Sequence, residues 1–107
     1  MRRFGSIIKI KPEGREEYIR WHANPMPGVN EMIKECNISN YSIFIRGDYL
    51  FSYYEYIGDN YEADMEKMAA DPVTQKWWSV VKPLMQPLED REENEFWSEM
   101  QEIYYLA

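Results

Sequence analysis

The single histidine of the chain, His22, has the side chain best suited to exchange a proton at neutral pH. Tyr18 lies four residues earlier, in a segment whose apolar spacing predicts a helix, so the phenol and the imidazole share one helical face. Such a pair can bind and protonate a hydroxyl or ether oxygen. A partly exposed histidine beside a packed tyrosine explains the same residues without chemistry, and residue type alone favours that simpler interpretation.

Two adjacent tryptophans, Trp77 and Trp78, form a second candidate. Successive helical side chains point about 100° apart, so we expect one indole in the core and the other at a cavity. A flat indole suits the C–H face of a sugar or another ring. Two core tryptophans explain the pair equally well.

Tyrosines recur in the predicted strands, and each buried phenol needs a hydrogen-bond partner that a bound polyol can supply. Ordinary sheet packing explains most of them individually. These residues are Tyr41, Tyr53, Tyr54, Tyr56, Tyr104 and Tyr105.

Composition limits the class of protein. The 107 residues, 1–107, are enough for one domain, and the net charge of −7 argues against a nucleic-acid or anionic-membrane partner. One cysteine, Cys36, excludes an internal disulfide, and with one histidine it gives no transition-metal cluster. We find no phosphate-binding glycine loop, apolar span or signal peptide, and we expect a cytoplasmic protein.

The elements that must position these side chains follow from periodicity and from Gly/Pro breaks. The expected elements are a strand at 4–10, a helical region at 15–36 interrupted near Asn24–Gly28, strands at 38–45 and 49–57 around an Arg46-Gly47-Asp48 hairpin, a helix at 61–70, a helix from Pro72 capped by Asp71, and a last strand at 100–106. The acidic stretch 88–98 gives no clear assignment.

This order predicts an α+β, ferredoxin-like (βαββαβ) fold, with helices on one face of a four-stranded antiparallel sheet. The strand at 49–57 is apolar on both faces, with Phe51 and Tyr53 opposite Leu50 and Tyr54. Helices cover only one face, so we expect a lined pocket, a partner sheet or both on the other. A symmetric homodimer is the common way to supply such cover.

The chain resembles the L-rhamnose mutarotase family over nearly its whole length. The features that carry the resemblance are Glu17-Tyr18 with His22, Asn40-Tyr41-Ser42-Ile43, Gln75-Lys76-Trp77-Trp78, and Met100-Gln101-Glu102-Ile103-Tyr104-Tyr105-Leu106. The family implies a dimeric α+β barrel and interconversion of the α and β anomers of L-rhamnose, a small neutral sugar, without a cofactor or metal.

The resemblance also implies roles for individual residues. His22 matches the family's proton donor, and Tyr18, Tyr41, Trp77 and Trp78 match its sugar-binding positions. On this basis we expect His22 to exchange a proton with the ring oxygen while Tyr18 or Tyr41 orients hydroxyls or relays the second proton.

The chain departs from the family at Met26-Pro27-Gly28, where the family usually carries Trp-Pro-Glu. A changed pocket rim leaves L-fucose or another deoxy-sugar open as the substrate. Two other functions fit the same residues: a cofactor-free or haem-using monooxygenase on the same barrel, and a non-catalytic module that binds a small ligand.

Overall fold

The computed structural model describes all of residues 1–107. Its strands are β1 (Arg2–Ile10), β2 (Ile38–Arg46), β3 (Tyr49–Tyr56), β4 (Met85–Gln86) and β5 (Ser98–Met100), and its α-helices are α1 (Arg15–Ala23), α2 (Val29–Glu35), α3 (Tyr61–Ala70) and α4 (Pro72–Val81). Short 3-10 turns at Pro12–Gly14 and Lys82–Leu84 precede α1 and β4.

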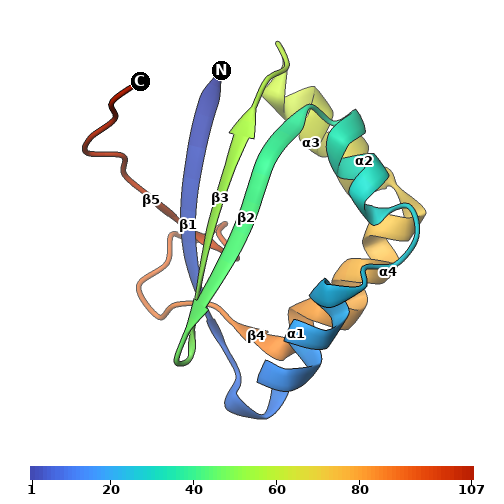
Figure 1. Ribbon diagram of the computed structural model, residues 1–107, viewed down its shortest axis with the longest axis vertical. Helices are drawn as coiled ribbons and strands as arrows, with labels where there is room; N and C mark the ends of the chain where they lie inside the picture. Colours follow the sequence, from blue (N-terminus) through green and yellow to red (C-terminus); the bar gives the residue numbers. More distant parts are fainter.

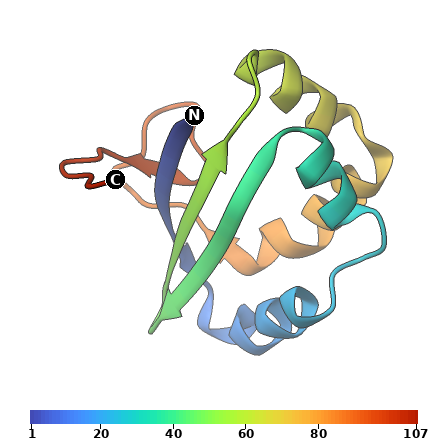
Figure 2. The same cartoon turned by 45° about the horizontal axis from the view of Figure 1, so that its top comes forward.

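The sheet confirms the ferredoxin-like prediction. Its strand order is β2-β3-β1-β4, all pairs are antiparallel, and β5 also pairs with β1. The sheet is curled, and the four helices all lie on its concave side (Figures 1 and 2). None of the helices has the length and apolar run that crossing a bilayer requires.

The main core lies between the concave face and the helices. Ile8 and Ile10 of β1 and Leu50 of β3 are almost fully buried there, against Trp77 and Val81 of α4. Alternate residues of a strand point to opposite faces, as the sequence predicted, and the structure shows that the even-numbered side chains of β1 and β3 are the ones that face the helices. The aromatic residues that flank His22 therefore belong to the main core.

The predicted interruption of the first helical region is present and separates α1 from α2. Pro25 and Pro27 cannot donate the hydrogen bonds that a continuous helix needs. Gly28 then turns the chain with a φ of +97°, and a Cβ at this position would lie 3.3 Å from Cγ1 of Val73. This turn ends α1 one residue beyond His22 and lets α2 start in a new direction.

The start of α4 also agrees with the sequence. The Asp71 carboxylate accepts hydrogen bonds from the Thr74 backbone N–H at 2.9 Å and from the Thr74 hydroxyl at 2.8 Å, and Pro72 occupies the first helical turn. This cap fixes the register of the helix that carries Trp77 and Trp78.

The predicted last strand at 100–106 is wrong. Of these residues only Met100 belongs to a strand, and the chain beyond it projects away from the sheet and the helices (Figure 1). The edge of β1 already pairs with β4 at Lys9 and Ile10 and with β5 at residues 5–7, which leaves the tail little edge to pair with. Instead Arg3 holds the tail through its side chain, with two hydrogen bonds of 2.8 Å to Glu102.

The convex face of the sheet is apolar and uncovered within one chain, as expected. Phe44 is 66% exposed there, next to Phe51, and Met100 lies against Gly5. The tail adds the exposed side chains of Ile103 and Leu106. We expected a pocket on this convex face, but the larger of the two cavities found lies on the concave face.

The two glycines with positive φ give a matched test of the turn that follows His22. Gly47, at φ +58°, has open space around its Cα, whereas Gly28 lies against Val73. We expect Gly47→Ala to lower the free energy of unfolding by about 1–2 kcal/mol, the cost of a left-handed backbone. Gly28→Ala adds crowding and should cost more. Urea unfolding followed by circular dichroism measures both, and equal losses would contradict the packing role of Gly28.

Candidate functional site

His22 is held in one orientation by its own helix. Its Nδ1 lies 2.8 Å from the carbonyl oxygen of Tyr18, one turn earlier. A carbonyl oxygen only accepts hydrogen bonds, so Nδ1 carries the proton and Nε2 is the nitrogen left to accept one in the neutral ring. The imidazole also stacks on the Tyr18 phenol, with ring centroids 4.1 Å apart. The half-buried ring thus offers a defined nitrogen rather than a freely rotating side chain.

Besides the Tyr18 phenol, an indole ring also packs against His22. The ring of Trp77 lies edge-on to the imidazole with centroids 5.1 Å apart, and it meets Trp21 at 6.1 Å in a T-shaped pair. Glu17 accepts a hydrogen bond of 3.2 Å from the Trp21 indole N–H, which fixes that ring as well. The structure therefore brings together His22, Tyr18 and Trp77 from the predicted set.

Trp78 occupies a different side of α4. Trp77 is 7% exposed, whereas Trp78 is half-buried and lies under the Lys82 ammonium, whose Nζ is 4.4 Å from its ring centroid. The same Nζ lies 5.2 Å from the ring centroid of Phe96. One indole, that of Trp77, lies in the core as expected, and it is the one beside the histidine. Trp78 is not in the wall of either cavity described below, so its expected place at a cavity is not found. Trp78 instead supports the segment that contains Phe96.

Burial sets the protonation of these groups at neutral pH. Desolvation lowers the pKa of His22, and the hydrogen bond to the Tyr18 carbonyl only partly opposes this effect. Desolvation raises the pKa of Tyr18, and the nearby Tyr41 phenol raises it further. Tyr41 is 43% exposed as a whole residue, but desolvation of its phenol raises its pKa to about 12. The imidazole is therefore mainly neutral at pH 7, while both phenols keep their protons.

A β-bulge brings Tyr41 to the concave face. The β2–β3 register shifts between Ser39 and Ser42, where Asn40 adopts a left-handed φ of +50° and its side-chain amide donates a 2.8 Å hydrogen bond to Glu55. Asn40 and Tyr41 together face one residue of β3, Tyr54, and such bulges redirect a side chain. The rings of Tyr41 and Tyr54 lie 5.5 Å apart.

A cavity of about 320 Å³ opens beside Tyr41, between the concave face of the sheet and the segment before β5. Its wall contains residues of four strands of the sheet, β1, β2, β3 and β5, and of the end of the acidic stretch, but none of His22, Tyr18, Trp77 and Trp78. The lining residues are Phe4, Ser6, Tyr41, Ser52, Tyr54, Tyr61, Asn94, Glu95, Phe96, Trp97 and Glu99. Phe96 and Trp97 also pack against the core that contains Tyr18 and Trp77, and Tyr41 of the cavity wall is close enough to Tyr18 to raise its pKa.

The sequence did not predict that the acidic stretch 88–98 contributes residues to the wall of this cavity. Phe96 and Trp97 are the two aromatic residues in an otherwise acidic segment, and that contrast was the available signal. Glu95 closes the segment on itself, because its carboxylate accepts 3.1 Å hydrogen bonds from the backbone N–H groups of Glu92 and Glu99. Ser6 and Ser52 carried no sequence signal at all.

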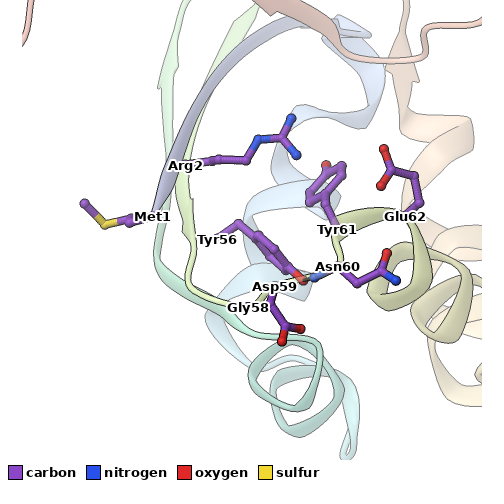
Figure 3. Close-up of a pocket in the computed structure, with 8 residues that line it drawn as sticks. All are labelled: Met1, Arg2, Tyr56, Gly58, Asp59, Asn60, Tyr61 and Glu62. Atoms are coloured by element: carbon purple, nitrogen blue, oxygen red, sulfur yellow. Dashed lines mark hydrogen bonds between the residues drawn. The ribbon is translucent and has the colours of Figure 1, made fainter.

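A second cavity, of about 240 Å³, lies at the start of α3 (Figure 3). Tyr61 belongs to the walls of both cavities, and Arg2 packs over its ring at 4.8 Å from the centroid. The Tyr56 hydroxyl here donates to Asp64 and accepts from the Asn60 backbone N–H, so it is already satisfied. This cavity contains no residue of the predicted site, and its hydrogen bonds anchor α3 to the sheet.

The chemistry available at the first cavity is proton exchange with uncharged groups. No lysine or arginine lines it, and the structure has no cluster of three potential metal ligands. The cavity supplies phenols that donate and aromatic walls, whereas the neutral imidazole that accepts at Nε2 lies against Tyr18 and Trp77 of the main core. It suits a ligand with hydroxyl groups and one apolar face.

Comparison with known proteins matches the chain to one family over almost its whole length. A sequence profile of the L-rhamnose mutarotase family matches residues 3–106. An L-rhamnose mutarotase of Listeria monocytogenes is 33% identical over 109 aligned residues that cover 100% of both chains.

Solved structures extend the likeness in fold. An L-rhamnose mutarotase from Formosa agariphila superposes with a TM-score of 0.77 at 23% identity and covers 100% of both chains. Tetracenomycin F2 cyclase from Streptomyces glaucescens, a polyketide cyclase, superposes with a TM-score of 0.72 at 18% identity and covers 100% of this chain and 98% of its own. At these identities the likeness concerns the fold alone, which therefore hosts more than one chemistry.

The environment of His22 predicts a direct NMR result. Because the folded-state pKa of His22 is lowered, the unfolded chain binds the proton more readily, and stability should fall as pH drops below about 6.5. A nitrogen-15 titration of this single histidine should give a pKa below 6.5, with the neutral ring protonated at Nδ1. His22→Gln should remove this part of the acid destabilisation in urea unfolding. A neutral ring protonated at Nε2 would contradict the Tyr18 hydrogen bond.

Proposed function

Because the chain belongs to the L-rhamnose mutarotase family, we propose that it interconverts the α and β anomers of L-rhamnose. The observation that carries the chemistry is the free Nε2 of His22, whose ring is fixed by its contacts with Tyr18 and Trp77. The cavity lined by Tyr41 has no basic residue in its wall. The reaction is an isomerisation with no net change in oxidation state, so the protein groups need only move protons.

The state of His22 suggests where the first proton goes. The ring oxygen of a closed sugar has no proton to give, so a neutral Nε2 takes its proton from the anomeric hydroxyl. The resemblance implied a proton donor acting at the ring oxygen, and that role needs the imidazolium, which the lowered pKa of His22 disfavours. We therefore assign His22 as the general base of ring opening and, in the reverse step, as the acid of ring closure.

Ring opening also needs a proton for the ring oxygen. Tyr41 lines the cavity and keeps its phenol proton, because burial raises its pKa to about 12. As Tyr41 protonates the ring oxygen and His22 deprotonates the anomeric hydroxyl, the C1–O5 bond breaks and C1 becomes an aldehyde. Rotation about C1–C2 followed by the reverse transfers closes the ring as the other anomer, with the protein returned to its starting state.

The remaining predicted residues position the sugar. Tyr18 fixes the imidazole by its carbonyl oxygen and its ring, and Trp77 gives the apolar wall beside it. Trp78 does not contact the sugar directly in this proposal. It contacts Lys82, and Lys82 packs on Phe96 of the cavity wall, so Trp78 supports that wall.

A second copy of the chain is the proposed cover for the convex face. Phe44 and Met100 are exposed on or beside this face, and the tail adds Ile103 and Leu106. Monomers rarely leave a patch of this kind in water, and a two-fold pairing of equivalent faces buries it on both copies. In such a homodimer the tail residues also gain a partner surface that one chain lacks.

The charge and the cysteine suggest the setting. A net charge of −7 disfavours nucleic acid and anionic membranes as partners. Cys36 is buried and reduced, with no second thiol, which is typical of a reducing compartment such as the cytoplasm.

Replacing His22 tests the proposed function. We expect His22→Gln to lower the enzymatic rate of anomer exchange of L-rhamnose by about 10²–10⁴-fold, because it removes the general base. Saturation-transfer NMR measures the exchange, with L-fucose and other deoxy-sugars in parallel to define the substrate. The wild-type rate should also fall as pH drops through the lowered pKa of His22. An unchanged rate in a folded variant would exclude this role, and no acceleration with any sugar would favour a binding module.

The oligomeric state provides a separate test. Phe44→Glu places a charge on the exposed convex face and should convert the proposed dimer to monomers. Ile19→Glu changes an apolar residue of α1 that is 43% exposed on the helical side, and it should leave the dimer intact. Light scattering after gel filtration gives the mass of each variant, and a wild-type monomer would contradict the proposal.

A further inference from the structure

Three polar residues stand side by side on the otherwise apolar concave face. Ser6 of β1 pairs directly with Ser52 of β3 on one side and with Glu99 of β5 on the other. Residues directly opposite each other in antiparallel strands point to the same face, with Cβ atoms about 4.5–5.5 Å apart. Phe4 and Ile8, the concave-face neighbours of Ser6 along β1, are both buried and apolar. We call Ser6, Ser52 and Glu99 the polar row.

The polar row forms part of the wall of the larger cavity. Ser52 is only 7% exposed, and it forms part of the cavity wall. A ligand in the cavity can therefore form a hydrogen bond with its hydroxyl. A hydroxyl at this place, between apolar neighbours, favours a ligand with its own hydroxyl groups.

Glu99 adds a charge that no cation neutralises. Its backbone N–H donates to Glu95, and its side chain, in a residue that is exposed overall, forms part of the cavity wall. The pKa of Tyr54 is raised by burial first, then by its hydrogen bond to Tyr61, and further by the negative charge of Glu99. The carboxylate therefore acts on the cavity wall near the Tyr54 phenol.

We propose that the polar row binds adjacent hydroxyl groups of the sugar and that Glu99 restricts the site to uncharged sugars. A carboxylate accepts hydrogen bonds from two neighbouring hydroxyls, and such charge-assisted bonds are stronger than neutral ones. With Glu95 and Glu99 and no basic residue in its wall, the cavity repels sugar acids and sugar phosphates. This inference rests on the proposed function and names the substrate class of that site.

The row and the histidine have separate tasks in this arrangement. The polar row forms hydrogen bonds with those sugar hydroxyl groups that are remote from C1. The C1 atom and the ring oxygen then face His22 and Tyr41. Because the row holds the closed and the open sugar alike, its loss weakens binding more than the proton transfers.

The test separates binding from catalysis by using a sugar that cannot open. Methyl α-L-rhamnoside lacks the anomeric proton, so its dissociation constant, measured by calorimetry, reports binding alone. We expect Glu99→Gln to raise this constant and the KM for L-rhamnose by about ten- to a hundred-fold, with kcat changed less than about threefold. Ser52→Ala should raise both about three- to ten-fold. Glu93→Gln, an exposed position outside the cavity, is the matched charge control and should change neither.

The outcomes distinguish the two proposals. If the wild type accelerates exchange but Glu99→Gln binds and turns over like Glu93→Gln, the polar row is not the hydroxyl site. Efficient exchange of an anionic sugar such as L-rhamnuronate by the wild type would also overturn the inference. If the wild type accelerates no sugar, the proposed function itself fails, whereas tight binding of the methyl glycoside that depends on Glu99 would still support the polar row.

Discussion

The hydrogen bond from His22 Nδ1 to the Tyr18 carbonyl oxygen is the constraint on which the chemistry of this fold depends. A backbone carbonyl has two acceptor sites, so it can serve the helix and the imidazole together. The bond determines which nitrogen holds the proton, and stacking on Tyr18 and contact with Trp77 keep the ring where it is. Burial then keeps the ring neutral. Without the bond, either nitrogen could carry the proton, and the direction of the first proton transfer would not be defined.

The second structural requirement is that Tyr41, from the sheet, lies close to the residues around His22, which come from the helices. The β-bulge in β2 brings Tyr41 there. Regular alternation along β2 would not supply an additional residue opposite Tyr54, because each position would face a single partner. The bulge at Asn40 adds that residue and directs Tyr41 to the concave face. Tyr41 is then close enough to Tyr18 to raise its pKa and also forms part of the cavity wall. One irregular position in a strand therefore places a phenol that lines the cavity close to Tyr18, the residue on which the imidazole stacks.

The fold was largely predictable because its signals are local. Alternating strands, the proline break after α1 and the Asp71 cap each depend on residues near in sequence, and all three appear as expected. The grouping of His22 with Trp77 required the family resemblance, because no local pattern brings α1 to α4. The predicted strand at 100–106 was wrong since alternation shows only a tendency to extend, while a strand also needs a free edge to pair with. The serines of the polar row gave no signal because their position depends on the pairing of three strands.

The departure of this chain from the family pattern after His22 is explained by packing at the helix break. Met26 packs against the core that includes Tyr18 and Trp77, so an apolar side chain still supports the histidine there. Gly28 adopts a φ of +97° against Val73, a conformation and a spacing that a glutamate would strain. In this chain a glycine therefore suits position 28 better than a glutamate. The imidazole, its carbonyl partner and the indole wall lie together beside this turn.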